Sequence, residues 1–439
     1  MKKIIKWVND EKTIQKSKKP YSHFDYKTDI SQCWKYISNP ENIEKHGFYP
    51  FIHYKQTQIK YSKKTGKKLK VRNICYAAHI DSCIYQYYSF LLNDMYNSRV
   101  KLDNIDNVSV AYRTDLGKSN IHFAKQAFDF IRKWDSCFIM IGDFTDFFDT
   151  LSHVYLKQQI CNLMQVKELP NDYYAVFKNV TKYSMVELSD LLQLNKLNDT
   201  PAGRKRINNK EKIISTEEFR NNKSLIKKNQ NSYGIPQGSP ISALLANIYM
   251  LECDKEIHEF VKQNNGFYMR YSDDFMIIIP DVKISEMKAI YSTIKNILSS
   301  IPNLKLQPQK TQIYSYSNCI VKNKGKLFDN NLDDSNKFIN FLGFSFDGKN
   351  IFIRDKTVSK YYYRMYRKAK TISNHRGYIN GHRISNENIY NRYSVKGARK
   401  KPGNFITYVN RSNKEFNDDA ISRSTKRHLQ KIKKAIHNY

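Results

Sequence analysis

The sequence lacks any apolar run long enough to cross a membrane. The apolar run within its first six residues, Met1 to Lys6, is too short for a signal peptide. Its seven cysteines lie far apart and include no CxxC pair, which favours buried thiols over a disulfide framework or a zinc site. The eleven histidines show no HExxH spacing, so a zinc enzyme is not indicated. Together these absences predict a cytoplasmic protein with no membrane partner.

Acidic residues are scarce as well. The chain has 41 Asp and Glu residues against 74 Lys and Arg residues, a formal net charge of +33. An excess of this size repels itself unless a polyanion compensates it, so nucleic acid is the expected partner. A general bias towards Lys, Asn, Ile and Tyr is the competing explanation, but it would raise Asp and Glu too. From residue 356 onward there are 21 Lys and Arg residues and only 4 Asp and Glu residues.

What the sequence does contain is a mixture of strand and helix patterns over 439 residues, enough for several domains or subdomains. In residues 67–74, Lys70 and Arg72 alternate with apolar residues, which predicts a strand with one basic face. Residues 138–141 predict a short strand that ends at Gly142-Asp143. Further patterns predict helices over 84–92, 121–133, 243–253 and 284–299, and a strand pair over 338–353 that turns at Asp347-Gly348. The fold class indicated is α+β.

The segment Tyr271-Ser272-Asp273-Asp274 lies between two apolar runs, which predicts a β-hairpin with two adjacent carboxylates at its turn. Like charges at the tip of a buried hairpin repel each other and are costly to desolvate. A divalent cation is the usual compensation, although aspartate is also common in ordinary turns.

A third carboxylate, Asp143, closes the apolar strand that precedes it. Together with Asp273 and Asp274 it would provide the oxygen ligands that Mg²⁺ prefers. Two such ions can activate an attacking 3′-hydroxyl and stabilise a leaving pyrophosphate. The alternative is that Asp143 caps a following helix, a role that Asp146 and Asp149 suit better.

Between the two carboxylate segments lies the loop Gly234-Ile235-Pro236-Gln237-Gly238-Ser239-Pro240. Two glycines and two prolines fix a rigid turn against which a flat base pair can lie closely. The Gln237 amide offers both a donor and an acceptor to a nucleotide. Taken alone this segment would also suit an ordinary loop.

In order, the motifs DFTDFFD, GIPQGSP, R-YSDD-F, LQPQKT and FLGF resemble those of a reverse transcriptase, in particular the bacterial retron, group II intron and abortive-infection or defence-associated enzymes. The resemblance covers residues 65–350, with one departure where Ser82 follows Asp81. It implies a right-hand polymerase with fingers, a palm of antiparallel sheet plus helices, and a helical thumb. The implied boundaries are a basic N-terminal extension 1–45, fingers 46–142, palm 143–345 with an insertion 183–230, and a basic thumb 346–439.

The resemblance also implies the catalytic residues. Asp143, Asp273 and Asp274 would bind two Mg²⁺ ions, with Mn²⁺ as an alternative, and the Phe144 backbone carbonyl would contact the second ion. Lys310 would protonate the leaving pyrophosphate, although a surface lysine before a strand is the competing interpretation.

The remaining implied residues bind nucleotide or primer. Lys70 and Arg72 would clamp the triphosphate, and Arg suits this as a bidentate donor. Phe148 would exclude a ribose 2′-hydroxyl, with a core aromatic as the alternative, and Gln237 would lie over the incoming nucleotide. The primer grip would be formed by Phe341, Leu342 and Gly343.

The resulting prediction is an RNA-directed DNA polymerase that copies an associated structured non-coding RNA in antiviral (phage) defence. About 95 residues follow FLGF, room for a thumb but not for an intron-type DNA-binding and nuclease extension. Its partners would be an RNA template, dNTPs and the DNA product, and a homo-oligomer stays open. One alternative is template-independent or protein-primed synthesis, for which 32 tyrosines offer hydroxyls. An alternative of another class is an RNA-binding maturase or scaffold with a polymerase fold.

Overall fold

The structure, a computed structural model, describes residues 2–62, 66–332, 334–375, 378–379, 382–383, 386–399 and 402–437. The chain forms two compact units, each treated separately below. The first unit comprises Met1–Tyr112, Phe144–Glu256 and Asn296–Lys305, and the second comprises Arg113–Asp143, Ile257–Lys295 and Leu306–Tyr439. The predicted α+β class is confirmed. The units reflect contacts within the chain, and the fingers, palm and thumb boundaries stay predictions.

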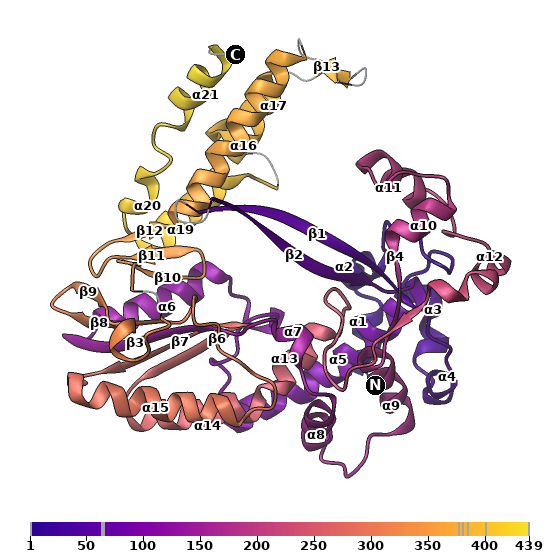
Figure 1. Ribbon diagram of the computed structural model, residues 1–439, viewed down its shortest axis with the longest axis horizontal. Coiled ribbons are helices and arrows are strands. Elements are labelled where there is room, and N and C mark those ends of the chain that lie inside the picture. The colour runs from indigo at the N-terminus through magenta and orange to yellow at the C-terminus, as the bar shows by residue number, and fades with distance from the viewer. Residues whose placement is uncertain are drawn as a thin grey trace. The chain divides into compact units, whose positions relative to one another are not determined.

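The first unit combines many helices with one four-stranded sheet (Figure 1). Its strands are β1 (Phe51–Ser62), β2 (Gly66–Tyr76), β4 (Ser184–Glu187) and β5 (Lys227–Lys228). Its helices are α1 (Lys2–Val8), α2 (Glu11–Ser17), α3 (Ile30–Ile37), α4 (Pro40–Glu44), α5 (His79–Leu102), α7 (Phe147–Thr150), α8 (His153–Met164), α9 (Asn171–Thr181), α10 (Leu188–Leu194), α11 (Pro201–Asn208), α12 (Thr216–Asn221) and α13 (Ser242–Tyr249). A helix α14 (Leu251–Gln263) begins here and ends in the second unit.

The long hairpin of β1 and β2 confirms the predicted strand with a basic face. Lys70 pairs with Gln58 across the hairpin, and Arg72 pairs with Gln56. The opposite face stays open to solvent, with Ile59 and Leu69 72% and 58% exposed. Only the base of the hairpin continues into the sheet, where β1 pairs in parallel with β4. The predicted insertion 183–230 therefore supplies the two remaining strands of this sheet, in the order β2-β1-β4-β5.

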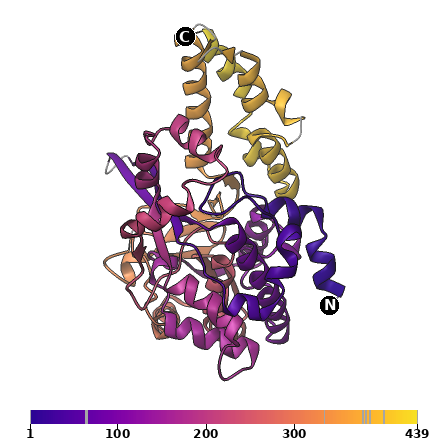
Figure 2. The same cartoon turned by 90° about the vertical axis from the view of Figure 1, so that its right-hand side faces the viewer.

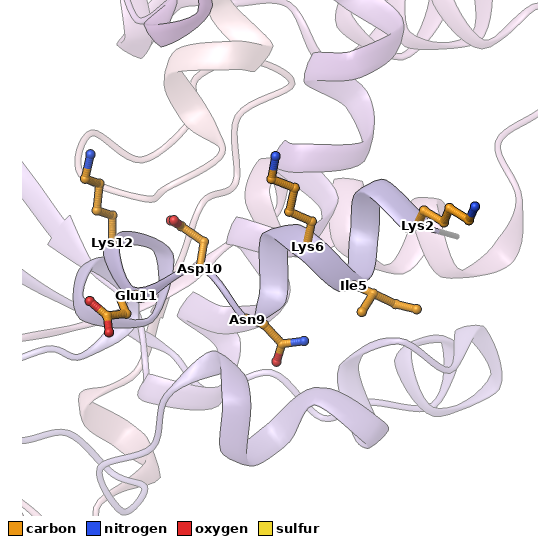
Figure 3. A pocket seen from close by; sticks show the side chains of 7 residues that line it. All are labelled: Lys2, Ile5, Lys6, Asn9, Asp10, Glu11 and Lys12. Carbon is orange, nitrogen blue, oxygen red and sulfur yellow. The ribbon is translucent and has the colours of Figure 1, made fainter.

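The N-terminal segment is helical and packs on α5. Trp7 of α1 stacks on Phe90 of α5 with ring centroids 4.5 Å apart. Asp29 begins α3 with a reciprocal capping box. A surface hollow over α1 and α2, shown in Figure 3, is lined by three lysines together with Ile5, Asn9, Asp10 and Glu11. None of the predicted site residues lines this hollow.

His23 lies just after these helices and is fully buried. Its Nε2 lies 3.3 Å from the Tyr76 carbonyl oxygen. Burial, and after it the neighbouring His79, lower the pKa of His23 from the usual 6.5 to about 3. The folded protein therefore holds this ring neutral under conditions in which an unfolded chain would protonate it.

Acid is therefore expected to destabilise the first unit through His23. The unfolded chain takes up this proton first, so the stabilisation is complete above the unfolded pKa of 6.5 and is lost as the pH falls towards 3. At a pH of about 5 the loss is about 2 kcal/mol. Denaturant unfolding near pH 7.5 and pH 5 measures it. His23→Gln should reduce the difference in unfolding free energy between the two pH values, and an unchanged difference would contradict this role of His23.

The second unit is built on a five-stranded antiparallel sheet in the order β6-β7-β3-β8-β9. The strands are β3 (Ser136–Asp143), β6 (Phe267–Tyr271), β7 (Asp274–Pro280), β8 (Gln312–Ser317) and β9 (Ile320–Asn323). A three-stranded sheet contains β10 (Ile339–Phe341), β11 (Phe344–Phe346) and β12 (Ile351–Ile353), and a short pair contains β13 (Tyr378–Ile379) and β14 (His382–Arg383). The helices are α6 (Asn120–Arg132), α15 (Ile284–Ser300, which ends in the first unit), α16 (Asp355–Asn374), α17 (Asn386–Tyr393), α18 (Val395–Ala398), α19 (Phe405–Phe416), α20 (Ala420–Arg423) and α21 (His428–His437).

The two central strands, β3 and β7, are apolar on both faces because helices cover the sheet on each side. Residues 137–143 are all buried, and so are residues 275–280. Helix α6 packs on β6 and β7, and α15 runs along the other side of the sheet (Figure 1). Four elements predicted from the sequence are therefore confirmed, namely α6, β3, α15 and the β6–β7 hairpin. The patterns at 84–92 and 243–253 became the longer α5 and the two helices α13 and α14, which meet at Met250.

The C-terminal helices pack side by side around a core of their own, as Figures 1 and 2 show. Tyr361, Met365 and Ala369 of α16 lie in this core, together with Ile389 of α17 and Ile432 of α21. The predicted turn at Asp347-Gly348 is confirmed, because Phe346 pairs with Ile351 across it. The sequence pattern missed the third strand, β10, on the other side of β11.

All seven cysteines are free thiols, and five are buried, in line with the sequence analysis. Cys33 is half-buried and Cys319 is exposed, so the prediction of buried thiols is wrong for Cys319, which lies in the turn between β8 and β9. Across the described ranges, no helix is both long and apolar enough to span a membrane.

Candidate active site

Asp143 and Asp274 stand opposite each other at the ends of two neighbouring strands. Asp143 is the last residue of β3, Asp274 is the first of β7, and the antiparallel register pairs them directly. Directly paired residues have Cβ atoms about 5 Å apart and point to the same face, so both carboxylates lie together where the two strands end. Of the two side chains, Asp143 is buried and Asp274 is open to solvent.

Asp273 lies in the two-residue turn that joins β6 to β7. Tyr271 pairs with Asp274, so Ser272 and Asp273 form the loop, and Ser272 has a left-handed φ of +63°. The fully buried Arg270 donates from Nη1 to the Ser272 carbonyl oxygen at 2.9 Å. A buried cation under the turn fixes its backbone and places positive charge beneath the acidic residues.

The acidic neighbours of Asp274 affect its ionisation. Although part of its side chain is open to solvent, the pKa of Asp274 is raised to about 7, first by desolvation of the carboxyl group among the surrounding protein atoms and then by its hydrogen bond with Asp143. The charges of Asp273 and Asp143 raise it further, whereas the Lys310 charge lowers it. Asp143 and Asp273 therefore both act electrostatically on Asp274.

Lys310 is also part of this cluster. Its Nζ lies 2.5 Å from Oδ1 of Asp143, and the lysine side chain remains 41% exposed. The turn before β8 places it there, because the Gln307 backbone N–H donates to the Asp143 carbonyl oxygen and the Lys310 N–H donates to the Gln307 carbonyl oxygen. Lys310 is thus both a partly exposed lysine before β8 and a contact of Asp143, and its role in proton transfer stays a prediction.

The donor set suits a divalent cation. Carboxylate oxygens are the ligands that Mg²⁺ prefers, and neighbouring carboxylates that repel each other are stabilised by a cation between them. Within the described residues, no group of three or more His, Cys, Asp or Glu side chains forms a preassembled metal site. Phe144, the residue after Asp143, belongs to the first unit, where its ring stacks on Phe147, and the role of its carbonyl stays a prediction.

The residues predicted to bind nucleotide all belong to the first unit. The loop 234–240 is bonded on one side to the chain at Phe148, where the Ile235 N–H donates to the Phe148 carbonyl oxygen at 2.9 Å. On the other side, the Cys75 N–H of β2 donates to the Gln237 carbonyl oxygen at 2.8 Å. Gly238, at φ +110°, permits this approach, because a Cβ there would overlap the Cys75 carbonyl oxygen. Lys70 and Arg72 lie further along the same strand, and the side chains of Phe148 and Gln237 are half-exposed.

The predicted primer-grip residues form the turn between β10 and β11 in the second unit. Phe341 is buried and pairs with Phe344, so Leu342 and Gly343 are the two loop residues. Both have left-handed backbone angles. Their assignment to primer binding stays a prediction.

Two residues that support the site were not recognised in the sequence. Arg270 holds the Asp273 turn, and the signal was an arginine inside an otherwise apolar strand. Gly142 leaves the space in which the Phe275 ring packs across β3, and a glycine directly before a predicted catalytic aspartate was the available signal.

Comparison with protein families identifies residues 62–346, well over half of the chain, as "Reverse transcriptase (RNA-dependent DNA polymerase)". The chain therefore belongs to the reverse transcriptase family. The enzyme class predicted from the sequence, an RNA-directed DNA polymerase, is confirmed at the level of this family. Domains of this family generally use divalent metal ions.

Among solved structures, the chain is similar to telomerases. It matches an apo telomerase from Candida tropicalis, truncated from its C-terminal domain, with a TM-score of 0.41 and 13% identity over 74% of this chain and 60% of that one. It matches a Candida albicans telomerase in complex with the TWJ fragment of telomeric RNA with a TM-score of 0.37 and 13% identity, over 93% of this chain and 65% of that one. The chain thus spans less than two thirds of these telomerases. Comparison with curated proteins finds no match.

Proposed function

We propose that this protein is an RNA-directed DNA polymerase that copies an associated structured non-coding RNA with Asp143, Asp273 and Asp274 as its metal ligands. The observation that carries the proposal is the direct pairing of Asp143 with Asp274, inside the region that matches the reverse transcriptase family. The two ions we propose there are Mg²⁺, with Mn²⁺ as an alternative. Held by these carboxylates, the ions would activate the attacking 3′-hydroxyl and stabilise the charge of the leaving pyrophosphate.

The residues of the chain hold the reacting groups in place. The β3 and β7 ends fix two of the carboxylates, and the Arg270-supported turn fixes the third. Lys310 holds a proton on Nζ next to Asp143, a position from which it would protonate the leaving pyrophosphate. The nucleotide side would be formed by β2, Gln237 and Phe148, which hydrogen bonds tie together within the first unit.

Helix α16 offers a surface for the nucleic acid. After the exposed Asp355 at its first position, no exposed residue of the helix is acidic, and six of them recur at helical spacing along one side: Lys356, Lys360, Tyr363, Arg364, Arg367 and Lys370. We name this surface the α16 stripe. The Arg367 guanidinium lies 5.8 Å from the centre of the Tyr363 ring, a pairing of cation and aromatic that suits stacked bases and phosphates. The stripe and the net charge support RNA as template and partner.

We also propose that the enzyme acts in antiviral defence and comes from a bacterial defence-associated lineage. The support is the resemblance of its ordered motifs to those enzymes. Expression of the gene with its flanking sequence in a phage-sensitive host, beside the Asp273→Asn variant, tests this role. Equal phage titres on the two strains would argue against it.

Sequencing of the nucleic acid that co-purifies with the protein tests the polymerase proposal. The protein should retain one dominant RNA and convert labelled dNTPs with Mg²⁺ into DNA complementary to it. RNase treatment before the assay should stop synthesis. Undiminished synthesis after RNase treatment would point to template-independent polymerisation instead.

Replacement of Phe148 by alanine is expected to weaken discrimination against ribonucleotides. The ring is half-exposed and follows Asp143 by five residues, and its removal would leave room for a 2′-hydroxyl. We expect incorporation of rNTP relative to dNTP to rise roughly tenfold or more, which corresponds to about 1.4 kcal/mol. Competition assays with matched rNTP and dNTP measure it. The buried neighbour Phe147 provides the control, since its truncation should lower stability without changing the ratio.

A second candidate function is protein-primed synthesis, and one hydrogen-bonded chain in the first unit favours it. The Tyr36 hydroxyl donates to Nδ1 of His46 at 2.9 Å, and Nε2 of His46 donates to the buried carboxylate of Asp81 at 2.8 Å. The Tyr49 backbone N–H donates to the other oxygen of Asp81 and fixes it. This is the arrangement of a hydroxyl nucleophile with an oriented base. Burial, and then the Asp81 charge, raise the pKa of Tyr36, so the hydroxyl keeps its proton until a base removes it.

In this candidate function, the Tyr36 oxygen would bond to the α-phosphorus of a dNTP while pyrophosphate leaves and His46 takes the proton. Tyr36→Phe is then expected to abolish DNA that stays covalently attached to the denatured protein, and to spare extension of an added primer. Gel mobility of labelled protein after nuclease digestion measures the attachment. The exposed Tyr174 supplies a matched Tyr→Phe control. Attachment that survives Tyr36→Phe would exclude this residue as the primer.

A further inference from the structure

The turn between β10 and β11 adopts a conformation that its sequence does not favour. Phe341 pairs with Phe344, so the loop has two residues, with φ of +47° at Leu342 and +93° at Gly343. Glycine adopts such angles freely, but a bulky leucine does so rarely and with backbone strain. A strained backbone of this kind persists only where its surroundings hold it.

Two hydrogen bonds from outside the hairpin hold this turn. Nδ2 of Asn120, the first residue of α6, donates to the Leu342 carbonyl oxygen at 2.9 Å. The backbone N–H of Arg354, the residue before α16, donates to the Gly343 carbonyl oxygen at 3.0 Å. Both carbonyl groups of the strained loop are therefore fixed by the starts of two helices.

The same Asn120 amide also reaches α19. Its Nδ2 donates to the Tyr408 hydroxyl oxygen at 3.1 Å, and the Tyr408 ring stacks on Phe344 with centroids 6.1 Å apart. Phe416, further along α19, packs on Phe344 at 4.8 Å. One amide group thus connects α6, the turn and the C-terminal helices.

The α16 stripe lies on the helix that begins directly after Arg354. A nucleic acid bound along the stripe would act on a helix whose preceding residue, Arg354, is bonded to Gly343. The turn, α16 and α19 therefore belong to one hydrogen-bonded assembly within the second unit. The polar side chains that close it are Asn120 and Tyr408.

We propose that Asn120 and Tyr408 are positioning residues that hold the Leu342–Gly343 turn against the primer strand and tie it to the C-terminal helices that grip the duplex. The proposal rests on the proposed polymerase function. Aspartate in place of Asn120 would present a carboxylate oxygen to the Leu342 carbonyl oxygen, which can only accept, and would release the turn, whereas the Tyr408 hydroxyl could turn to donate to the carboxylate. A carboxylate at the start of α6 suits the helix dipole, so the variant is expected to fold.

The test compares Asn120→Asp and Tyr408→Phe with Asn410→Asp, an exposed position on α19 that undergoes the same change of charge. The measurement is the number of nucleotides added per binding event on an RNA template with a DNA primer, together with the KM for dNTP. We expect the number to fall roughly tenfold for Asn120→Asp and about threefold for Tyr408→Phe, with KM for dNTP unchanged. Asn410→Asp should behave as the wild type.

A second substitution separates positioning from general damage. Glycine at position 342 adopts the left-handed conformation without support, so Leu342→Gly should restore much of the loss when added to Asn120→Asp. The proposal is overturned if both single variants keep the wild-type number, if Asn410→Asp loses as much, or if Leu342→Gly restores nothing. If the wild type makes no DNA at all, the polymerase proposal fails. Hydrogen exchange at the Phe344 amide then tests, independently of activity, whether Asn120 holds the Leu342–Gly343 turn. Exchange about tenfold faster in Asn120→Asp but not in Asn410→Asp supports the proposed positioning of the turn by Asn120, and equal exchange in the two variants overturns it.

Discussion

Replacement of Asp274 by asparagine is expected to abolish DNA synthesis without unfolding the protein. Its carboxylate stands opposite Asp143, and an amide in its place removes one of the charges that would hold the divalent ions. We expect the rate of nucleotide addition to fall at least roughly a thousandfold, about 4 kcal/mol in the activation free energy. RNA binding should remain, because the basic surfaces are untouched. Single-turnover primer extension and a filter-binding assay measure the two properties.

The stability of the same variant distinguishes this explanation from simple damage. The pKa of Asp274 is raised to about 7, so the folded state holds the ionised form less favourably than the unfolded chain does. As the pH rises from the usual carboxyl pKa of 3.8 towards 7, ionisation of Asp274 therefore lowers the free energy of unfolding. Asparagine does not ionise, so the variant does not lose this stability. The variant should melt at the wild-type temperature or above it near pH 8. Asp281→Asn, at the exposed far end of β7, is the matched control and should polymerise normally. Normal synthesis by Asp274→Asn would refute the catalytic assignment.

The acidic cluster was predictable because its signals are local. An apolar strand that ends in aspartate and a hairpin with two aspartates at its turn each specify where their side chains emerge. The sequence could not state that β3 and β7 are neighbours, since pairing between strands 130 residues apart depends on the whole sheet. The register that sets Asp143 opposite Asp274 is therefore a finding of the structure.

Elements without a strong period were the hardest to foresee. The segment 183–230 has a weak pattern, yet two of its short strands complete the sheet of β1 and β2, because a paired neighbour supplies the hydrogen bonds that local propensity does not. The positive φ of Leu342 was equally unpredictable, because leucine rarely adopts such an angle. The conformation is held by a hydrogen bond from Asn120, 222 residues away in the chain. Cys319 was expected in the interior on residue type alone, but it lies in a tight turn at the end of β8.

Gly142 is where the packing of the sheet and the chemistry of the site meet. It precedes Asp143, pairs with Phe275, and leaves open the space that the Phe275 ring fills. The ring is fully buried, so it has nowhere to move if a methyl group is added to position 142. An alanine Cβ would overlap two atoms of this ring, closer than real side chains approach. The strands would have to separate at the pair next to Asp143 and Asp274.

Gly142→Ala is therefore expected to lower stability by about 1–3 kcal/mol and to reduce DNA synthesis by more than the unfolded fraction explains. The second effect follows because a shift of the strand ends separates the two carboxylates, and small displacements of catalytic groups cost roughly a hundredfold in rate. Denaturant unfolding and primer extension on the folded enzyme measure the two effects. Gly47→Ala is the matched control, because a Cβ there meets no atom within 4 Å. Phe275→Leu, combined with Gly142→Ala, removes the overlapping ring atoms and should recover part of both losses, which would not happen if Gly142 were needed only for backbone freedom.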